Sequence, residues 1–325
     1  MKKIKKIAVL TSGGDAPGMN AAIRAVVRTG IHHDLEVFGI RRGYDGLVHD
    51  DIFQMEAESV AQIIQRGGTM LKTVRSEEFR TEKGLEKAYQ NIQKYKIDAL
   101  AVIGGDGTFT GAKIFGKKYG IPILGLPGTI DNDLAGTDYA IGYDTAINTV
   151  MNAVDKIRDT AESHDRLFVV EVMGRDSGLI ALRSGISIGA EAVLIPEIEV
   201  DYDKIIEKLS KNTRKNKSSR IVIVAEGDKD GGIVVAEKLK ESFPHFDIRV
   251  SILGHIQRGG RPSCMDRVLA SRLGVAAVEG LLQGRKGEMV GIVCGEVVYT
   301  PFDRSIKHID KIDENLTNMV DILSL

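Results

Sequence analysis

The sequence contains no tryptophan and only two cysteines, Cys264 and Cys294, among its 325 residues. The cysteines form neither a CxxC pair nor a cluster with histidine, which argues against a disulfide framework and a structural zinc site. A reducing compartment is the natural interpretation, so we expect a cytoplasmic protein. No apolar run reaches the roughly 18 residues of a transmembrane helix, and the run at Ile7 to Leu10 is too short for a signal peptide. No membrane association is expected.

The sequence also lacks a charge excess of either sign. Its 44 Lys plus Arg oppose 45 Asp plus Glu, which leaves a formal net charge of −1. No overall field would therefore attract nucleic acid or an acidic membrane, and any binding of anions must be local. With 43% apolar and 27% charged residues, the chain can bury one large core or two ordinary ones, and about two globular domains are expected.

Short apolar runs that end in Gly or Asp alternate with longer helical patterns. Continuous hydrophobicity is typical of strands buried on both faces, as in parallel sheets, so the predicted class is α/β. The expected strands are Ile7–Leu10, Ala99–Ile103, Ile121–Leu124, Leu167–Val170, Ile221–Val224 and Val290–Val293. Helices are expected over Pro17–Thr29, Tyr143–Ser163 and Cys264–Leu282, and the polar run Lys211–Ser219 is expected to be a surface loop.

Two glycine-rich turns directly follow expected strands. They are Thr11-Ser-Gly-Gly-Asp-Ala-Pro-Gly-Met-Asn20 and Gly104-Gly-Asp-Gly-Thr108. Free backbone N–H groups and the positive end of a helix bind anions at such turns. Neither turn has Walker A spacing or the complete dinucleotide fingerprint, so a different phosphate-binding loop is predicted. Asp106 can reach a magnesium ion that bridges nucleotide phosphates, or it can simply cap the next helix.

A third segment, Leu126-Pro-Gly-Thr-Ile-Asp-Asn-Asp133, places two carboxylates two residues apart. One can act as a base while the other shapes the field or a metal shell. A calcium loop fails as an interpretation because Ala135 and Gly142 occupy positions that need oxygen ligands. Guanidinium groups match phosphate bidentately, although each arginine alone, like His255, can equally be an ordinary surface or structural residue. The candidates are Arg24, Arg28, Arg75, Arg166, Arg175, Arg249 and Arg258.

These segments, together with Val172-Met-Gly-Arg175 and Gly254-His-Ile-Gln-Arg-Gly-Gly260, closely resemble the bacterial-type ATP-dependent 6-phosphofructokinases, the phosphofructokinase A family, in order over nearly the whole chain. The Gly-Gly-Asp-Gly-Thr element also occurs in NAD kinases and diacylglycerol kinases, whereas the combination is specific. The resemblance implies a glycolytic kinase that moves the γ-phosphate of ATP onto the 1-hydroxyl of fructose 6-phosphate, with Mg²⁺ as cofactor.

The resemblance also implies the architecture: two three-layer α/β domains with mostly parallel sheets and a cleft between them. The nucleotide-binding domain would comprise residues 1–139 plus 252–303. The fructose 6-phosphate domain would comprise residues 140–251 plus 304–325, with a last helix around Asp313 to Ile322.

Each matching position acquires an implied role from the family. Catalysis is implied for Asp131, as the base, and for Thr129, Arg75 and Arg175. ATP would be bound by Gly14, Arg75, Ser76, Gly105, Asp106, Gly107 and Thr108, with Asp106 on the Mg²⁺. The sugar phosphate would be bound by Thr129, Ile130, Asp131, Met173, Gly174, Arg175, Glu226, His255, Ile256, Gln257 and Arg258, and by Arg166 and Arg249 of a neighbouring subunit.

A homotetramer with active and effector sites shared between subunits is also implied. ADP would activate and phosphoenolpyruvate would inhibit at an effector site made of Arg24, Ala25, Val26, Val27, Arg28, Arg158, Glu191, Lys215, Lys217, Ser218 and Ser219. The sequence departs from the family pattern beside these sites, at Arg41, Arg42, Asp176, Ser177 and Arg261.

Three alternatives stand against the ATP-dependent kinase. Pyrophosphate-dependent relatives tend to carry Asp at the position of Gly107 and Lys at that of Gly128, and the two glycines here favour ATP. A non-catalytic sugar-phosphate-binding regulator would be expected to lose Asp106 or Asp131, and both are present. A nicotinamide dehydrogenase would need the complete glycine fingerprint, but Thr110 occupies the place of its third glycine.

Overall fold

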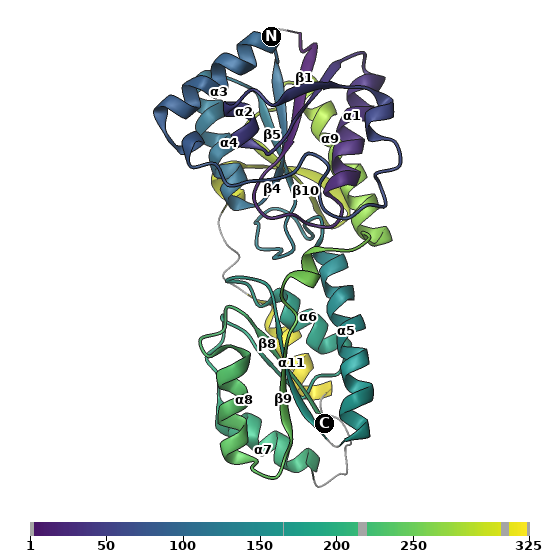
Figure 1. Ribbon diagram of the computed structural model, residues 1–325, viewed down its shortest axis with the longest axis vertical. Coiled ribbons are helices and arrows are strands. Elements are labelled where there is room, and N and C mark those ends of the chain that lie inside the picture. Colours follow the sequence, from purple (N-terminus) through teal and green to yellow (C-terminus); the bar gives the residue numbers. More distant parts are fainter. Residues whose placement is uncertain (1–2, 165, 214–219, 307–311, 324–325) are drawn as a thin grey trace. The chain divides into compact units, whose positions relative to one another are not determined.

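The computed structural model describes residues 3–164, 166–213, 220–306 and 312–323 (Figure 1). Its contacts divide the chain into two compact units, each assembled from separate segments. Unit 1 comprises Met1–Thr129, Leu134–Thr145 and Arg258–His308, and unit 2 comprises Ile130–Asp133, Ala146–Gln257 and Ile309–Leu325. The short segment Ile130–Asp133 therefore groups with unit 2, whereas the sequence analysis placed it in the first domain.

Unit 1 is built on a seven-stranded sheet. The four pairs among its five inner strands are parallel, and each edge strand runs antiparallel to its neighbour. Ile7 pairs with both Val37 and Ala99, so the first strand lies inside the parallel part, between the strands that carry these two residues. The order is β11 (Glu296–Pro301), β10 (Glu288–Val293), β5 (Ile123–Pro127), β4 (Ala99–Gly104), β1 (Lys6–Thr11), β2 (Glu36–Ile40) and β3 (Ile52–Met55).

Helices cover both faces of this sheet, as Figure 1 shows, with α1 and α9 on one side and α3 and α4 on the other. The first two pack so closely that a Cβ atom at Gly274 would lie 2.5 Å from the Cβ atom of Ala25. On the other side Phe109 and Phe115 belong to one buried cluster. The elements are α1 (Met19–His32), α2 (Tyr44–Val48), η1 (Ala57–Val60), η2 (Glu78–Arg80), α3 (Glu82–Tyr95), α4 (Asp106–Tyr119), α9 (Cys264–Leu282) and α10 (Phe302–Ser305).

Unit 2 is built on a four-stranded parallel sheet, in the order β7 (Ala192–Leu194), β8 (Arg220–Ala225), β6 (Leu167–Val172) and β9 (Ile248–Ile252). Leu209 and Leu239 pack with Val222 in a second buried cluster. The helices are α5 (Tyr143–Ser163), α6 (Leu179–Ser187), α7 (Tyr202–Thr213), α8 (Gly231–Ser242), η3 (Gly254–Arg258) and α11 (Glu314–Leu323). Of the helices in the described residues, none combines the length and hydrophobicity of a membrane span.

The predicted α/β class with mostly parallel sheets is confirmed, and so are all six predicted strands. Helices α5 and α9 have the predicted bounds, whereas α1 begins at Met19 and continues to His32. The predicted loop at Lys211–Ser219 is wrong in its first three residues, because α7 continues to Thr213 and residues 214–219 lie outside the described part. Five strands were not predicted: β2, β3, β7, β9 and β11.

The first turns of α5 and α9 cap each other in unit 1. The Ser263 hydroxyl, at the N-cap of α9, accepts a hydrogen bond from the Asp266 amide. The Asp266 carboxylate accepts from the amides of Gly142 and Thr145, both at 2.8 Å, and from the Thr145 hydroxyl at 2.5 Å. Burial raises the pKa of Asp266 in spite of these donors. The two helix starts, more than a hundred residues apart in sequence, are thus joined by one buried carboxylate.

Asp266→Ala should lower the free energy of unfolding by about 3–5 kcal/mol, because it leaves three buried donors without an acceptor. Urea unfolding followed by far-ultraviolet circular dichroism measures the change. Asp203→Ala is the matched control, since Asp203 is an exposed acid in the first turn of α7, and its effect should stay within about 0.5 kcal/mol. Equal effects of the two substitutions would contradict the capping role of Asp266.

Candidate active site

Three loops meet at the carboxyl edge of the parallel strands β1, β4 and β5. The Thr108 hydroxyl donates to the Ser12 carbonyl oxygen at 3.0 Å, which ties the second glycine loop to the first. The Ser12 amide donates to the Ile103 carbonyl oxygen and the Gly128 amide to the Gly104 carbonyl oxygen, both at 3.0 Å. Ligands of open α/β sheets bind at such an edge. The two glycine loops and the start of the third predicted loop, as far as Thr129, therefore lie on one platform in unit 1.

Two glycines of this platform have opposite surroundings. A Cβ atom at Gly104 would lie 2.3 Å from Thr108 Oγ1 and 2.4 Å from the Ser12 carbonyl oxygen, so only glycine fits there. A Cβ atom at Gly107 would have nothing within 4 Å, and this residue is exposed in the first turn of α4. The protein's own packing thus demands the first glycine and leaves open space beside the second.

The helix-capping interpretation of Asp106 is wrong, because the N-cap of α4 is Gly105 and Asp106 is the first residue of the helix. Among the described residues, no group of three or more His, Cys, Asp or Glu side chains could hold a metal ion. Mg²⁺ typically needs only one or two protein carboxylates when phosphates and water complete its shell. A half-buried Asp106 beside the open space at Gly107 fits an ion that arrives with a nucleotide.

The segment that carries Arg75 and Ser76 is tied to the first glycine loop. The Thr73 hydroxyl donates to the Gly13 carbonyl oxygen at 2.7 Å. Gly14 and Arg75 are exposed, so a ligand in solution can reach them. Arg258 also lies here: its Nη1 is 2.5 Å from where a Cβ atom of Gly14 would stand, and it donates to the Asp15 carbonyl oxygen at 3.3 Å. The guanidinium predicted to hold the sugar thus lies against a loop predicted to hold ATP.

The sequence analysis missed Tyr44 as a part of this platform. Its hydroxyl donates to the Thr108 carbonyl oxygen at 2.6 Å, and its ring stacks on Phe79 with 4.2 Å between the ring centroids. Burial raises the pKa of Tyr44 far above its usual value. The only sequence signal was an aromatic residue directly after a glycine. Tyr44 therefore supports the glycine loop from its buried side and does not face solvent.

The third loop continues from β5 into Thr129, Ile130 and Asp131. The Cβ atom of Thr129 lies 3.7 Å from the place that a Cβ atom of Gly105 would take, which brings this loop against the second glycine loop. Asp131 is only 3% exposed and Ile130 is fully buried. A carboxylate is rarely buried without a functional or structural reason. The burial of Asp131 thus makes its carboxylate a candidate for a catalytic group.

In unit 2, the loop after β6 carries Met173, Gly174 and Arg175. Glu226 Oε1 accepts from the amides of Gly174 at 3.2 Å and Arg175 at 2.8 Å, and both residues have positive φ, 147° and 54°. A Cβ atom at Gly227 would lie 1.9 Å from the Arg175 carbonyl oxygen, so that position must be glycine. The sequence analysis missed Gly227. Glu226 and Gly227 together fix the backbone from which the Arg175 side chain extends.

The segment from His255 to Gln257 divides into exposed and buried side chains. His255 and Ile256 are exposed. Gln257 is fully buried: its Oε1 accepts from the Met173 amide at 3.2 Å, and its Nε2 donates to the Gly254 carbonyl oxygen at 3.0 Å. The Gln257 side chain is therefore occupied within unit 2, so the predicted contact of this residue with the sugar would have to come from its backbone. This amide instead fixes the loop after β6.

The two arginines predicted to reach a neighbouring subunit share one carboxylate in unit 2. Arg166 Nε donates to Asp247 Oδ2 at 2.6 Å, and Arg249 Nε lies 2.8 Å from Asp247 Oδ1. The hydrogen bond from Arg166, followed by that from Arg249, holds the pKa of Asp247 below its usual value. The structure thus brings both guanidinium groups to one place, beside the edge strand β9.

The residues of the predicted effector site fall into three groups. Arg24 and Arg28 lie one turn apart on α1, where burial and then the charge of Arg28 lower the pKa of Arg24. Arg158 Nη2 donates to the Ile188 carbonyl oxygen at 2.5 Å in unit 2, where Glu191 is 2% exposed. Lys215, Lys217, Ser218 and Ser219 lie outside the described residues.

The remaining three predicted effector residues have buried side chains. Ala25 is 6% exposed, and Val26 and Val27 are fully buried. Their side chains pack in the core of unit 1, because the exposed face of α1 there belongs to Arg24 and Arg28. Their side chains therefore pack in the core, and the predicted contact with an effector would have to come from their backbone.

Comparison with known proteins supplies the family. The sequence model of the family Phosphofructokinase matches residues 6–281. The chain is 56% identical to the ATP-dependent 6-phosphofructokinase of Cytophaga hutchinsonii, over 99% of this chain and 98% of the relative. It is 53% identical to ATP-dependent 6-phosphofructokinase 2 of Bacteroides thetaiotaomicron over the full length of both chains.

Solved structures agree with this result. The phosphofructokinase of Saccharomyces cerevisiae is similar with a TM-score of 0.90 and 38% identity, over 98% of this chain and 47% of the yeast chain. This chain thus spans about half the length of that relative. The pyrophosphate-dependent phosphofructokinase of Marinobacter aquaeolei, at 22% identity and a TM-score of 0.83, shares the fold. The chain belongs to the phosphofructokinase family.

Proposed function

We propose that the protein is an ATP-dependent 6-phosphofructokinase, which transfers the γ-phosphate of MgATP to the 1-hydroxyl of fructose 6-phosphate and releases ADP and fructose 1,6-bisphosphate. The observation that carries the proposal is the glycine platform, where the open space at Gly107 adjoins Asp106 and where Gly105 lies against Thr129, at the start of the loop that leads to Asp131. The curated relatives that cover nearly the whole chain carry the same activity in their names.

On unit 1, the platform would bind the nucleotide. Amides at the start of α4 and the positive end of that helix favour the phosphates near Gly105, Gly107 and Thr108. Asp106 would hold Mg²⁺, which neutralises charge on the phosphates when it is bound with ATP. Arg75 would stabilise charge that develops on the transferred phosphoryl group, the contribution on which phosphoryl transfer depends most. Gly14 and Ser76 would complete the ATP site.

The acceptor sugar would be handled mainly by residues of unit 2. Asp131 would take the proton from the 1-hydroxyl as the oxygen attacks, with Thr129 and Ile130 lining the same loop. Arg175 would stabilise negative charge on the phosphoryl group, on a backbone that Glu226 fixes. Met173, Gly174 and His255 would contact the sugar.

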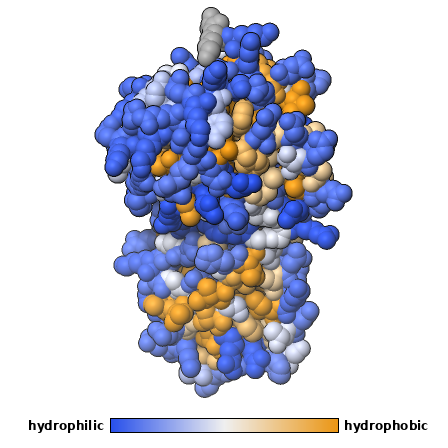
Figure 2. Space-filling view, turned by 45° about the horizontal axis from the view of Figure 1, so that its top comes forward, coloured by the Kyte–Doolittle hydropathy of each residue, from blue (hydrophilic) through white to orange (hydrophobic). Residues whose placement is uncertain are grey.

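We also propose a cytoplasmic homotetramer, in which Arg166 and Arg249 bind the 6-phosphate in a neighbouring subunit. The edge strand β9 supports this: Val250 is 37% and Ile252 is 55% exposed. Figure 2 shows hydrophobic side chains gathered on the surface of the unit drawn in the lower half. Exposed apolar patches of this kind commonly mark contacts between proteins. ADP and phosphoenolpyruvate would compete at an effector site that includes Arg24, Arg28, Arg158 and Glu191.

The test compares MgATP with magnesium pyrophosphate as donor, with fructose 6-phosphate as acceptor and purified protein. We expect kcat/KM with ATP to exceed that with pyrophosphate by at least about 100-fold, since the open space at Gly107 can accept the α-phosphate of a nucleotide. A better rate with pyrophosphate would make the chain a pyrophosphate-dependent enzyme. Binding of the sugar phosphate without turnover of either donor would make it a regulator.

A further inference from the structure

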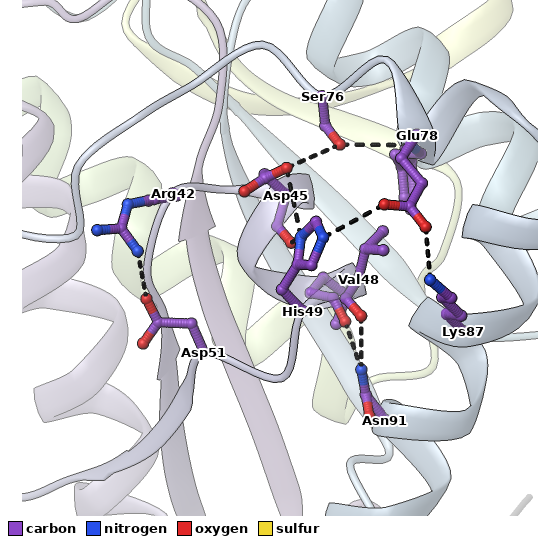
Figure 3. Close-up of polar contacts among 11 residues, drawn as sticks. Arg42, Asp45, Val48, His49, Asp51, Ser76, Glu78, Lys87 and Asn91 are labelled. Atoms are coloured by element: carbon purple, nitrogen blue, oxygen red, sulfur yellow. Dashed lines mark hydrogen bonds and ion pairs between the residues drawn. The ribbon is translucent and has the colours of Figure 1, made fainter.

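His49 lies between two carboxylates at the end of α2, as Figure 3 shows. Its Nδ1 is 3.5 Å from Asp45 Oδ1 and 3.0 Å from the Asp45 carbonyl oxygen. Its Nε2 is 3.3 Å from Glu78 Oε2. Every oxygen that faces the ring in these contacts is an acceptor. A neutral imidazole carries one N–H and can donate on one side only, whereas an imidazolium donates on both.

The same carboxylates hold the segment on which Ser76 lies. The Ser76 hydroxyl donates to Asp45 Oδ1 at 3.4 Å and accepts from the Phe79 amide at 3.3 Å. On the other side of Glu78, Lys87 of α3 donates to Oε1 at 2.7 Å. Hydrogen bonding by Lys87 is the main reason that the pKa of Glu78 lies below its usual value. Glu78 is therefore charged and available to His49 near neutral pH.

Arg75 is adjacent to this network and is held from both ends. On its N-terminal side, Thr73 donates to the Gly13 carbonyl oxygen at 2.7 Å. On its C-terminal side, Ser76 is bonded to Asp45, and Phe79 is buried against Tyr44. Between these points, Val74 and Arg75 are exposed and lie in no helix or strand. The position of the Arg75 backbone thus depends on two anchors, of which the second contains His49.

We infer that Asp45, His49 and Glu78 form a clamp that positions Arg75 and Ser76 for the nucleotide, and that the clamp is complete only when His49 is protonated. These are positioning residues, since they act on the nucleotide through Arg75 and Ser76. The inference rests on the proposed function, because it assigns the clamped segment to the ATP site. No part of the family resemblance assigned a role to Asp45, His49 or Glu78.

The charges around the ring determine the direction of the pH dependence. Asp45 and Glu78 face His49 directly, Lys87 and Lys83 of α3 oppose Glu78, and Ser76 offers a neutral hydroxyl. A neutral ring offers these two acceptors one donor in place of two. With a neutral ring, the segment that carries Arg75 and Ser76 should be held less firmly. The KM for ATP should therefore rise with pH toward the value of a variant that lacks the imidazole.

The experiment uses the full chain in four forms: wild type, His49→Ala, Glu78→Gln and the control Glu77→Gln. Glu77 is the exposed neighbour of Glu78, and its carboxylate pairs with Arg80 on the surface. Hydrogen–deuterium exchange of the peptide that spans residues 72–80 is measured without nucleotide. The KM for ATP and kcat are measured at several pH values. Because the side chain of His49 is 55% exposed, we expect only about a 3- to 10-fold rise in the KM for ATP, together with a fall in kcat of similar size, since Arg75 is also proposed to stabilise the transferred phosphoryl group.

The outcomes separate the two proposals. The clamp is supported if His49→Ala and Glu78→Gln show faster exchange and a higher KM for ATP, whereas Glu77→Gln shows neither. The difference in KM from wild type should also become smaller at high pH. Unchanged exchange overturns it, and so does faster exchange with an unchanged KM for ATP in an enzyme that uses ATP. If the wild type does not turn over ATP at all, the proposed function fails, and the assignment of the clamp to a nucleotide fails with it. The exchange data then still report whether His49 holds the segment.

Discussion

Asp131→Ser should lower kcat by about 10²–10⁴-fold while the protein still binds fructose 6-phosphate. The substitution removes the only proposed acceptor for the proton of the 1-hydroxyl, and it leaves Arg175 and its support by Glu226 in place. Serine is small enough for the site, in which Asp131 is 3% exposed. Steady-state kinetics measures kcat, and isothermal titration calorimetry measures the binding of the sugar phosphate.

Asp133→Asn is the matched control for this prediction, since Asp133 is a second buried carboxylate in the same segment, 8% exposed. It should reduce kcat far less, because the proposal places no proton on Asp133. If the control loses as much activity as Asp131→Ser while both variants keep their fold, Asp131 is not the base. The two acids would then act as one electrostatic unit.

Gly107→Asp should abolish the use of ATP without unfolding the protein. No atom lies within 4 Å of a Cβ atom at this position, so the fold accepts a side chain. The new carboxylate and the α-phosphate of ATP are both negative. Two unit charges about 4 Å apart, at an effective dielectric constant of about 20, repel by about 4 kcal/mol. That energy corresponds to roughly a 10³-fold rise in the KM for ATP. Steady-state kinetics with ATP and pyrophosphate, together with thermal unfolding, measures both parts of the prediction.

Gly107→Ala separates charge from volume in this experiment. Alanine fills part of the space but carries no charge, and a glycine-to-alanine change inside a helix favours the helix by about 0.5–1 kcal/mol. The alanine variant should therefore keep its thermal stability and most of its affinity for ATP. An equal loss in both variants would show that steric room, and not repulsion of the α-phosphate, makes this glycine selective.

The elements that the sequence predicted well are those buried on both sides. β1, β4, β6 and β8 are continuous apolar runs because neighbouring strands and helices enclose them. β9 was missed because it lies at the edge of its sheet, so exposed and half-buried residues replace a continuous run. β11 is likewise an exposed edge strand, and β7 has only three residues. A continuous apolar run reveals a strand only where both faces of that strand are buried.

The chemistry of the site was predicted from motifs, but the supporting contacts could not be. The three glycine-containing loops were identified because each follows a buried strand, and the structure brings them to one edge. The buried state of Gln257 and of Val26 could not be predicted, because both depend on partners distant in sequence. The same holds for Gly227, whose only reason for being glycine is the Arg175 carbonyl oxygen across a loop.

Unit 1 is made of separate segments of the chain, and this affects how the protein folds during its synthesis on the ribosome. β5 ends at Pro127, and its sheet neighbour β10 begins at Glu288, about 160 residues later. At about 5–20 residues per second, the open edge of β5 waits roughly 8–30 s for its partner. Meanwhile all four strands of unit 2 emerge, the last of them ending at Ile252. Nascent chains should therefore complete the sheet of unit 2 before that of unit 1. During this interval the exposed edge of the incomplete sheet of unit 1 is the part of the chain that a chaperone would bind.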